Sequence, residues 1–328
     1  MNLVQDFVDQ YESYKDLATV HVHSFVAHKT KKYPLVSIHF GNPQAPTLVI
    51  AGGVHGLERI GAQLSLSLLK SFHQRLSWDL IAKDFLKSVQ IVFIPLVNPV
   101  GYFELIRSNA DGVDLMRNAA IESEDKVPFL LGGHRYSAAL PWFRGHRVAQ
   151  ETEFVISTMQ SILEKSNRVI SLDIHSGFGF KDQLWFPFAN SRKEFTQLAE
   201  LGLFFELFEK THPYHVYKIE PQSKNYLTHG DIWDYCFINL KKENQVYLPL
   251  TLEMGSWIWV KKNPLQIFSK AGLFNPMKQH RMNRTLRRHR PFFDFLIHSL
   301  ISNEIWTQFD ENLKSKILDE ARKKYYEK

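Results

Sequence analysis

Apolar residues along the chain form short strand-like runs that alternate with longer segments of helical spacing. The runs typical of buried strands are Thr47–Ala51, Val89–Val97, Arg168–Ile174, Leu184–Phe188 and Val246–Leu252. Leu57–Phe72 and Glu151–Leu163 instead repeat apolar residues at the spacing of one helical face. Strands alternating with helices predict an α/β fold, a three-layer sandwich whose central mixed, mostly parallel, twisted sheet is flanked by helices.

The two ends of the chain have patterns of their own. Thr19–Ala27 and Tyr33–Phe40 flank a polar turn and predict a hairpin, within an N-terminal region that covers residues 1–46. Residues 260–328 are basic, have helical character, and are expected to pack on the rest of the protein. Because we find no internal repeat, low-complexity tract or long linker, we predict a single domain over residues 1–328.

Composition narrows the class of protein. The chain has 328 residues, of which 44% are hydrophobic and 23% charged, and this is typical of a globular protein. One cysteine, Cys236, excludes a disulfide scaffold and a cysteine-based metal cluster. There is no run of about 18 apolar residues, and acidic and basic residues interrupt the first twenty positions. We therefore expect a cytoplasmic protein with no membrane partner.

The net charge of +6 comes from one segment. Residues 261–290 contain nine Lys and Arg and no acidic residue, so the rest of the chain is slightly acidic. Pro264 and Pro276 interrupt this segment, and no nucleic-acid recognition motif accompanies it. We expect a solvated or substrate-attracting face here, and nucleic acid is not the expected partner.

Polar residues with catalytic chemistry follow two of the predicted strands. His55 follows the first of these strands, and Glu58 is expected in the first turn of the next helix, while His175 follows another strand. Ligand crevices in such folds lie outside the carboxyl ends of the strands. Either motif alone is more often a surface pair or a strand-end histidine. Together, two histidines and a carboxylate predict a three-ligand site for one zinc ion, with a fourth position open.

Three more side chains extend this constellation. Glu253 ends an apolar strand, where a carboxylate is costly unless it is used or paired. It suits a general base that removes a proton from water, and a buried structural ion pair is the alternative. Arg107 and Arg117 offer planar donors for an oxyanion or a substrate carboxylate, although each alone is more often a solvated surface charge.

In combination, these motifs resemble the zinc carboxypeptidase family (the funnelins), and in particular its compact bacterial-type members. The resemblance runs from about Thr47 to Trp257. Its most specific parts are Gly52–Glu58, the turn Asn98–Tyr102 followed by Arg107, Gly112–Asn118 and Asp173–Ser176.

The resemblance implies a role for each matching residue. His55, Glu58 and His175 would bind zinc, and Glu253 would be the catalytic carboxylate. The remaining implied roles are oxyanion stabilisation by Arg107, substrate binding by Arg117 and Asn109, and covering of bound substrate by Tyr226. The implied activity is zinc-dependent cleavage of a peptide or amide bond beside a carboxylate-bearing group, in a peptide or acyl-amino acid.

One position departs from the family pattern. Family members usually have asparagine before the substrate-binding arginine, and this chain has Met116 before Arg117. Methionine cannot donate a hydrogen bond to a terminal carboxylate. The motif therefore does not predict whether the enzyme is an exopeptidase, an endopeptidase or an amidase.

Two other functions fit parts of the sequence. One is an N-acyl amino acid deacylase of the aspartoacylase or succinylglutamate desuccinylase type, whose β-rich C-terminal domain contrasts with the helical character of residues 260–328. The other is a non-catalytic module that binds an anion or nucleic acid on the same fold. Retention of all three expected ligands and Glu253 disfavours this second alternative. The sequence does not predict an oligomeric state.

Overall fold

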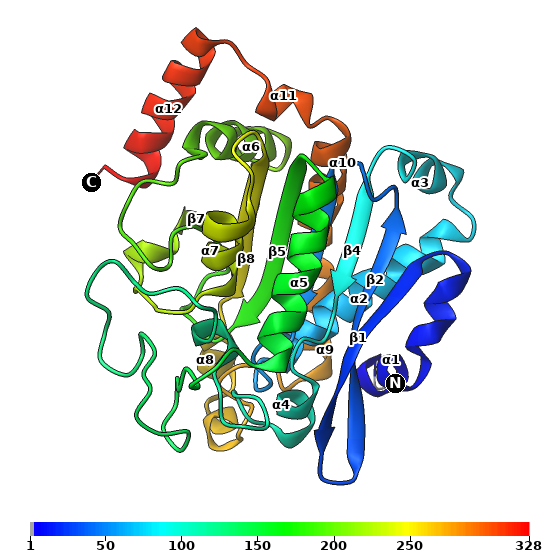
Figure 1. Ribbon diagram of the computed structural model, residues 1–328, viewed down its shortest axis with the longest axis vertical. Helices are drawn as coiled ribbons and strands as arrows, with labels where there is room; N and C mark the ends of the chain where they lie inside the picture. The colour runs from blue at the N-terminus through cyan, green and yellow to red at the C-terminus, as the bar shows by residue number, and fades with distance from the viewer. Residues whose placement is uncertain (1–2, 328) are drawn as a thin grey trace.

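The computed structural model describes residues 3–327 and contains one central eight-stranded sheet. The strands lie in the order β1-β2-β4-β3-β5-β8-β6-β7 (Figure 1). They are β1 Thr19–His28, β2 Lys31–Gly41, β3 Thr47–Gly52, β4 Gln90–Ile94, β5 Arg168–Ser176, β6 Gln183–Phe186, β7 Lys218–Pro221 and β8 Val246–Met254.

The centre of the sheet is parallel, and its flanks are mixed. β4, β3, β5 and β8 run parallel to one another, and β6 runs parallel to β7, whereas β1–β2, β2–β4 and β6–β8 pair antiparallel. Strands β3, β4 and β5 are buried almost throughout, as expected when helices cover both faces of a parallel sheet. The predicted mixed α/β sheet is confirmed, and so is the N-terminal hairpin.

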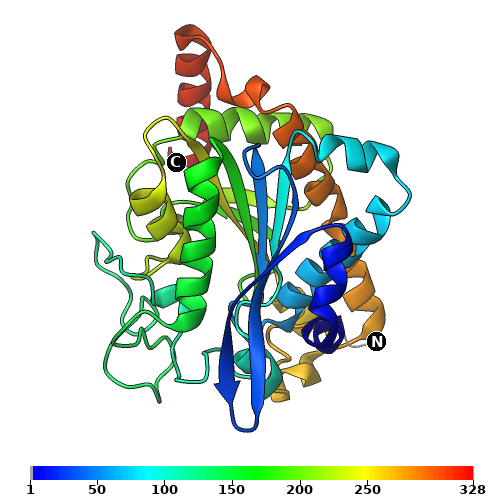
Figure 2. The same ribbon diagram turned by 45° about the vertical axis from the view of Figure 1, so that its right-hand side comes forward.

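Helices lie on both faces of this sheet and make the two outer layers. α5 and α7 cover one face, while α2 and α10 cover the other (Figure 2). The helices are α1 Leu3–Gln10, α2 Arg59–Leu76, α3 Leu80–Phe85, α4 Pro99–Glu104, α5 Gln150–Lys165, α6 Leu198–Thr211, α7 Ile232–Tyr235, α8 Trp257–Lys262, α9 Gln279–Arg288, α10 Arg290–Ile301, α11 Glu304–Thr307 and α12 Glu311–Tyr325.

Residues 260–327 form helices and turns, and their aromatic side chains join the core. Phe293 of α10 lies 6.4 Å from Phe72 and 6.1 Å from Phe93, measured between ring centroids. Tyr325 of α12 packs 5.2 Å from Phe186 of β6. The C-terminal segment is therefore helical, as predicted, and it packs against the sheet layer. No helix among residues 3–327 is long and apolar enough to cross a membrane.

Element boundaries differ from the prediction where the chemistry lies. β5 continues through Ser176, so His175 lies inside the strand. Helix α2 begins at Arg59, and Glu58 precedes it with a non-helical backbone, instead of lying in its first turn. The side chain of Glu58 is engaged with His175, which holds this residue outside the helix. β5 extends because His175 and Ser176 pair with Glu253 and Met254 of β8, and apolar periodicity detects neither this pairing nor the contact of Glu58.

Several elements, such as α1 and α3, have no counterpart in the predicted pattern, and β7 and α6 are two more. β7 has four residues, and Lys218 and Glu220 on it form an ion pair at the edge of the sheet, so it carries no apolar run. α6 does carry apolar residues at helical spacing, including Leu201, Phe204 and Phe208. The sequence therefore held a signal for α6 and none for β7.

Candidate metal centre and substrate cavity

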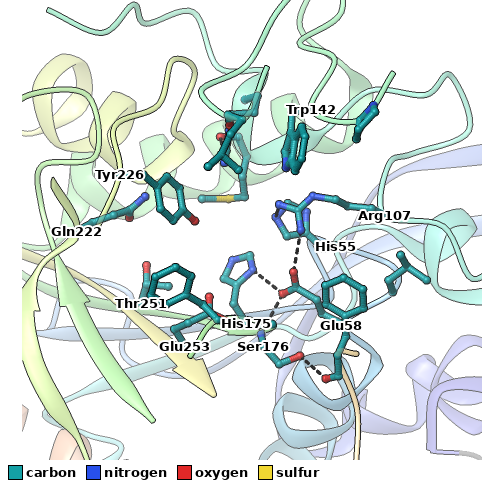
Figure 3. A pocket seen from close by; sticks show the side chains of 18 of the residues that line it. His55, Glu58, Arg107, Trp142, His175, Ser176, Gln222, Tyr226, Thr251 and Glu253 are labelled. Atoms are coloured by element: carbon teal, nitrogen blue, oxygen red, sulfur yellow. Dashed lines mark hydrogen bonds and ion pairs between the residues drawn. The ribbon is translucent and has the colours of Figure 1, made fainter. Parts of the chain in front are cut away.

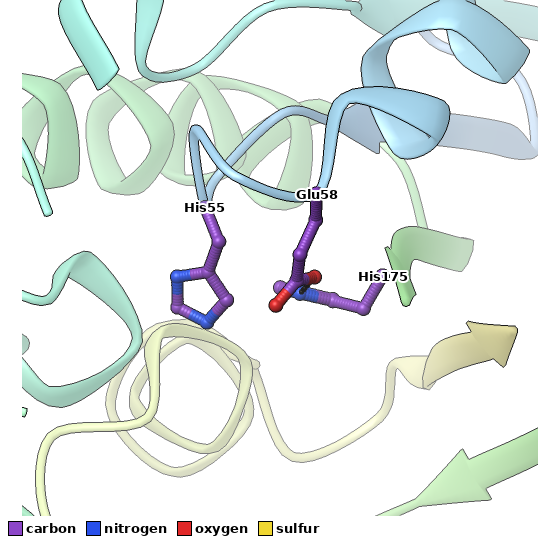
Figure 4. A group of neighbouring side chains, drawn as sticks. All are labelled: His55, Glu58 and His175. Atoms are coloured by element: carbon purple, nitrogen blue, oxygen red, sulfur yellow. Dashed lines mark hydrogen bonds and ion pairs between the residues drawn. The ribbon is translucent and has the colours of Figure 1, made fainter. Parts of the chain in front are cut away.

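His55, Glu58 and His175 converge at the carboxyl ends of β3 and β5 (Figure 4). One potential ligand atom from each residue lies within 4.8 Å of the others, and all three residues are buried. The turn that carries His55 packs tightly on α4, where a side chain at Gly56 would overlap the backbone of Gly101. The structure thus brings the three predicted ligands together from two separate strand ends.

Carboxylates hold His175 on both sides. Its Nε2 lies 2.6 Å from Asp173 Oδ2, and its Nδ1 lies 2.9 Å from Glu58 Oε2. Burial opposes the charged form, but these carboxylates together raise the pKa of His175 well above its ordinary value. Trp233 Nε1 donates to the same Asp173 oxygen at 2.7 Å. Asp173 therefore orients the ring, as outer carboxylates do for metal-binding histidines.

His55 is neutral and presents a lone pair to the site. Burial and the adjacent guanidinium of Arg107 lower its pKa to about 3. Arg107 Nη2 donates to His55 Nε2 at 2.7 Å, so that nitrogen is the acceptor. Nδ1 of His55 is buried without a hydrogen-bond partner.

These donors fit a divalent cation. Glu58 accepts from Arg107 Nη1 at 3.1 Å. Burial alone would raise the pKa of Glu58, but the two histidines and Arg107 outweigh burial and lower this pKa to about 2. A neutral imidazole, an ionised carboxylate and a second imidazole fixed by Asp173 form the His₂Glu donor set of open zinc sites. In this structure the guanidinium of Arg107 contacts two of those donors, which is the contact expected of a positive charge.

Asp114 fixes Arg107 from behind. Its Oδ2 accepts from Arg107 Nε at 2.8 Å, and its Oδ1 lies 3.8 Å from His55 Nδ1. Asp114 also accepts the backbone N–H of Met116 at 3.2 Å, which ties the following loop to the site. Burial favours the neutral acid, but Arg107 outweighs it and keeps the pKa of Asp114 below its ordinary value.

Glu253, on β8, lies beside His175 of the neighbouring strand β5. The β5–β8 register pairs His175 directly with Glu253. Its Oε1 accepts the backbone N–H of Phe178 at 3.1 Å, and the side chain faces the cavity (Figure 3). Burial, reinforced by repulsion from Glu58, raises the pKa of Glu253 to about 8. A carboxylate with a raised proton affinity, next to a cluster of metal-ligand type, can act as a general base.

Arg117 is a buried cation without an anionic partner. Its side chain is 3% exposed, yet none of the described carboxylates forms an ion pair with it. Nε donates to the Leu131 carbonyl at 3.1 Å and Nη1 to the Met116 carbonyl at 3.2 Å, while Nη2 has no partner. Since an unpaired buried charge is costly, this guanidinium is suited to receive an anion.

The side chains surround a cavity of about 410 Å³ whose walls are largely apolar. Tyr226 forms one wall, 5.8 Å from the Arg117 guanidinium carbon and 5.9 Å from the Phe178 ring. Further apolar lining comes from Leu57, Met116, Trp185 and Phe274, and from Trp142 (Figure 3). A ligand there would place an apolar group among these side chains and an anionic group against Arg117.

Asn109 does not line this cavity. Its Nδ2 donates to Glu151 Oε2 at 3.0 Å, and its Oδ1 accepts the backbone N–H groups of Asp111 and Val113 at 3.0 Å. All its polar atoms therefore serve the loop that positions Asp114. The structure assembles the other predicted site residues around one cavity and places Asn109 behind it.

Sequence reasoning assigned no role to several residues of the site. Asp114 and Asp173 lie within the recognised motifs, so position alone could have indicated them. Trp142 directly precedes a weaker match to the family, Phe143–Gly145, and Phe274 lies outside every motif, and only the folded chain brings both to the cavity. No local signal predicts such a contribution.

Comparison with known proteins identifies a family and a fold. Residues 6–255 match the model of a family described as zinc carboxypeptidase. The fold is similar to thrombin activatable fibrinolysis inhibitor, with a TM-score of 0.66 and 18% identity over 93% of this chain and 74% of that chain. It is also similar to carboxypeptidase A from Helicoverpa armigera, with a TM-score of 0.59 and 15% identity over 97% of this chain and 71% of that chain. No curated protein matches the sequence.

Proposed function

Because the chain belongs to the zinc carboxypeptidase family and is a hydrolase of this class, we propose that the described site hydrolyses a peptide or amide bond beside a carboxylate-bearing group. The observation that carries this proposal is the convergence of His55, Glu58 and His175 within 4.8 Å of one another, next to Glu253. His55, Glu58 and His175 are close enough together to bind one cation, and Glu253 is close enough to them to act as a base on the same substrate.

His55, Glu58 and His175 would hold the zinc ion. When bound, zinc supplies a Lewis acid for the scissile carbonyl and lowers the pKa of a water toward about 7. Ligand atoms must be deprotonated to bind a metal, so loading should release a proton from His175, whose two ring nitrogens face carboxylates.

Glu253 would carry the proton. Its carboxylate accepts a proton from the attacking water and later delivers it to the leaving amine nitrogen. The backbone N–H of Phe178 holds Oε1, which leaves the other carboxylate oxygen available to the cavity. Its position directly across from His175 places the base beside the proposed metal ligand.

Arg107 would donate to the substrate carbonyl oxygen as negative charge develops there. Asp114 holds Nε at 2.8 Å, so the guanidinium stays oriented when its two Nη groups exchange Glu58 and His55 for substrate. The loss of one such donor from comparable sites costs about 3 kcal/mol of transition-state stabilisation.

The cavity supports a substrate with an apolar group next to a carboxylate. Arg117 supplies the cationic partner, Tyr226 covers one side, and Met116 replaces an amide donor with an apolar surface. The family implies a peptide substrate, and an acyl-amino acid has the same chemistry at the bond. We keep a cytoplasmic location as a prediction, in accord with the single free cysteine, Cys236.

The two alternatives receive less support from the site. A deacylase of the aspartoacylase type is disfavoured because the described residues from 260 to 327 form helices and turns instead of a β-rich domain. A non-catalytic module would have no reason to retain a buried, unpaired Arg117 together with a carboxylate of raised pKa at Glu253.

The test removes the base and keeps the metal. Glu253→Gln should lower kcat by at least about a thousandfold on any peptide or acyl-amino acid that the parent cleaves, because proton transfer is lost. Zinc content, measured by atomic absorption, should stay at one ion per chain, since Glu253 is not a ligand.

Glu151→Gln is the matched control. Glu151 is equally buried but bonds Asn109 behind the cavity, so its amide variant should keep zinc and most of the activity. Normal turnover by Glu253→Gln would disprove the assigned role. A parent that binds no zinc and hydrolyses none of free, amidated, murein-type or acylated substrates would overturn the proposed function.

A further inference from the structure

Apolar side chains project into solvent from one turn at the active-site end of the molecule. The turn is a 3-10 segment, Pro264–Phe268, that follows α8. Phe268 is 87% exposed and Leu265 is 76% exposed, and Ile267 and Trp257 are also exposed. A cluster of strongly exposed apolar side chains is uncommon on a soluble surface, so this cluster indicates an interaction site.

Unpartnered lysines surround these apolar side chains. Lys261, Lys262 and Lys270 are exposed, and the structure places none of their side-chain ammonium groups in a hydrogen bond or ion pair with the described residues, although the Lys262 backbone carbonyl accepts from Arg281 Nη2 at 3.2 Å. Between Glu253 and Asp294 the sequence has no acidic residue. We refer to residues 257–270 as the basic–apolar surface. Its charge is of one sign, and its centre is apolar.

Hydrogen bonds to the interior fix the backbone of this surface, so its apolar side chains stay exposed. Gln266, between the exposed residues, is buried and donates through Nε2 to the Gly272 carbonyl at 2.5 Å and the Asn275 carbonyl at 3.2 Å. A side chain at Gly272 would overlap the backbone of Gln266. With Gln266 fixed inward, Leu265 and Phe268 remain directed outward.

The surface adjoins the mouth of the substrate cavity. Trp257 donates its backbone N–H to the Gly179 carbonyl at 3.1 Å, and its ring lies 6.2 Å from Phe180. Phe274, which lines the cavity, accepts from Ser176 Oγ at 2.7 Å. α8 and its turn lie at the end toward which β5 and β8 point (Figures 1 and 2). A partner on this surface would lie beside the catalytic entrance.

We propose that the basic–apolar surface binds the surface of an anionic lipid membrane. Phe268 and Leu265 would enter the boundary between headgroups and acyl chains, and Trp257 suits the headgroup level. Lys261, Lys262 and Lys270 would face anionic headgroups, each strengthening binding by about fivefold. The expectation of no membrane partner rested on the absence of a spanning segment, whereas this contact is peripheral.

Charge and apolarity together favour lipid over nucleic acid. A phosphate backbone would satisfy the lysines but would leave Phe268 and Leu265 without an apolar environment. A second exposed apolar cluster provides an internal comparison. Leu80, on α3, is also 76% exposed, but Asp79 and Asp84 lie close to it in the sequence. Because these neighbouring residues are acidic, the surface around Leu80 does not fit an anionic membrane.

The experiment measures flotation of the full chain with vesicles. Binding is expected to vesicles of phosphatidylcholine with phosphatidylglycerol, and to be much weaker with phosphatidylcholine alone. Leu265→Ser with Phe268→Ser should weaken binding about tenfold or more, because both apolar anchors are lost. Lys261→Glu with Lys262→Glu should weaken it comparably and reduce its salt dependence.

Matched controls separate this surface from general effects. Leu80→Ser removes an equally exposed leucine from α3 and should leave vesicle binding unchanged. Lys31→Glu with Lys32→Glu changes the net charge equally on the β1–β2 hairpin and should have little effect. Since the exposed variants leave the cavity intact, turnover of a small soluble substrate should match the parent, independently of vesicle binding.

Three results would overturn the proposal. The first is equal binding to neutral and anionic vesicles, or no binding to either. The second is unchanged binding after both apolar anchors are replaced. The third is evidence that the surface has another partner. Such evidence would be a parent dimer in sedimentation that the Leu265→Ser with Phe268→Ser variant dissociates. It would equally be oligonucleotide binding that the lysine variant abolishes, in a parent that binds no vesicles.

Discussion

At position 107, one guanidinium is shared among three acceptors. Arg107 bonds Asp114, Glu58 and His55 at 2.8, 3.1 and 2.7 Å. Of these three contacts, only the one with Asp114 does not involve a proposed metal ligand, so it can persist when a cation binds Glu58 and His55. We infer that Arg107 balances the charge of Glu58 and donates to neutral His55 until a cation binds, and that it thereafter turns its Nη groups to the substrate.

Met116 is the residue whose change should alter substrate choice. Met116→Asn would place an amide donor in the cavity next to Arg117, whose Nη2 has no partner. The added hydrogen bond should raise kcat/KM for substrates with a free terminal carboxylate by up to about tenfold over their amidated forms. The measurement is kcat/KM for paired free and amidated peptides.

A conservative apolar change at the same position is the control. Met116→Leu keeps the apolar surface and should leave the free-to-amidated ratio near that of the parent. If the asparagine variant shows the same ratio as the leucine variant, the carboxylate does not bind beside position 116.

Among the elements, α2 shows how the metal site and the fold share residues. Glu58 is the residue before the helix, but its side chain is engaged with His175 and caps nothing. Asn275, which is 215 positions away in sequence, instead accepts the Ile60 N–H at 2.9 Å. Its Nδ2 also donates to the Leu57 carbonyl at 2.7 Å. The helix start and the turn that carries Glu58 are thus fixed by one distant amide.

Asn275→Ala should therefore weaken both the fold and the metal site. Loss of a helix cap costs about 1–2 kcal/mol in the free energy of unfolding, measured by urea denaturation. Because Glu58 lies between the two anchored residues, zinc affinity should fall by about tenfold, as for other supporting residues. Asn283→Ala, at an exposed position on α9, is the control and should change neither quantity. A stability loss with unchanged zinc affinity would limit Asn275 to the helix.

On the scale of the whole molecule, buried contacts join the C-terminal segment to the rest of the protein. His289 lies between α9 and α10, bonds the Tyr217 hydroxyl at 2.9 Å, and lies 3.8 Å from Asp182. Arg288 forms an ion pair with Asp182 at 2.7 Å. Together with the rings of Phe293 and Tyr325, these contacts join α9, α10 and α12 to the core of the protein.

A single domain predicts a single unfolding transition. Scanning calorimetry of the full chain should give one peak whose calorimetric and van't Hoff enthalpies agree, because the aromatic contacts of α10 and α12 are shared with the sheet. Two separable peaks would instead divide the C-terminal segment from the remainder.

His289 should make the folded protein sensitive to acid. Burial, the largest cause, lowers its pKa from 6.5 to about 4 in the folded state. The unfolded chain therefore takes up a proton below about pH 6.5, whereas the folded protein does so only near pH 4. The free energy of unfolding is maintained above pH 6.5 and falls between these values, by roughly 3 kcal/mol for a shift of this size.

Replacement of this histidine should flatten that pH dependence. His289→Asn can still bond Tyr217 but cannot titrate, so urea denaturation between pH 7 and 4 should show a smaller loss of stability than in the parent. His298→Asn, at an exposed position on α10, should behave like the parent. A parent-like pH slope in His289→Asn would mean that other groups cause the acid sensitivity.

The sequence by itself determined the alternation of strands and helices, and it predicted that His55, Glu58, His175 and Glu253 share one site. Apolar periodicity is local, and strand ends in a parallel sheet meet at one edge, so motifs after separate strands predict a shared site. The order of the strands, the ion pairs of Asp114 and the position of Asn109 behind the cavity followed only from the fold.

Only the tertiary structure decided what surrounds the ligands and what lies outside them. Asn275 caps α2 across 215 positions, Phe274 lines the cavity, and Gln266 holds Phe268 in solvent. Each depends on contacts between residues far apart in the chain, and no local pattern records such a contact. The basic segment could be read as a run of charge from sequence, but its exposed apolar centre required the folded chain, because exposure is a property of packing.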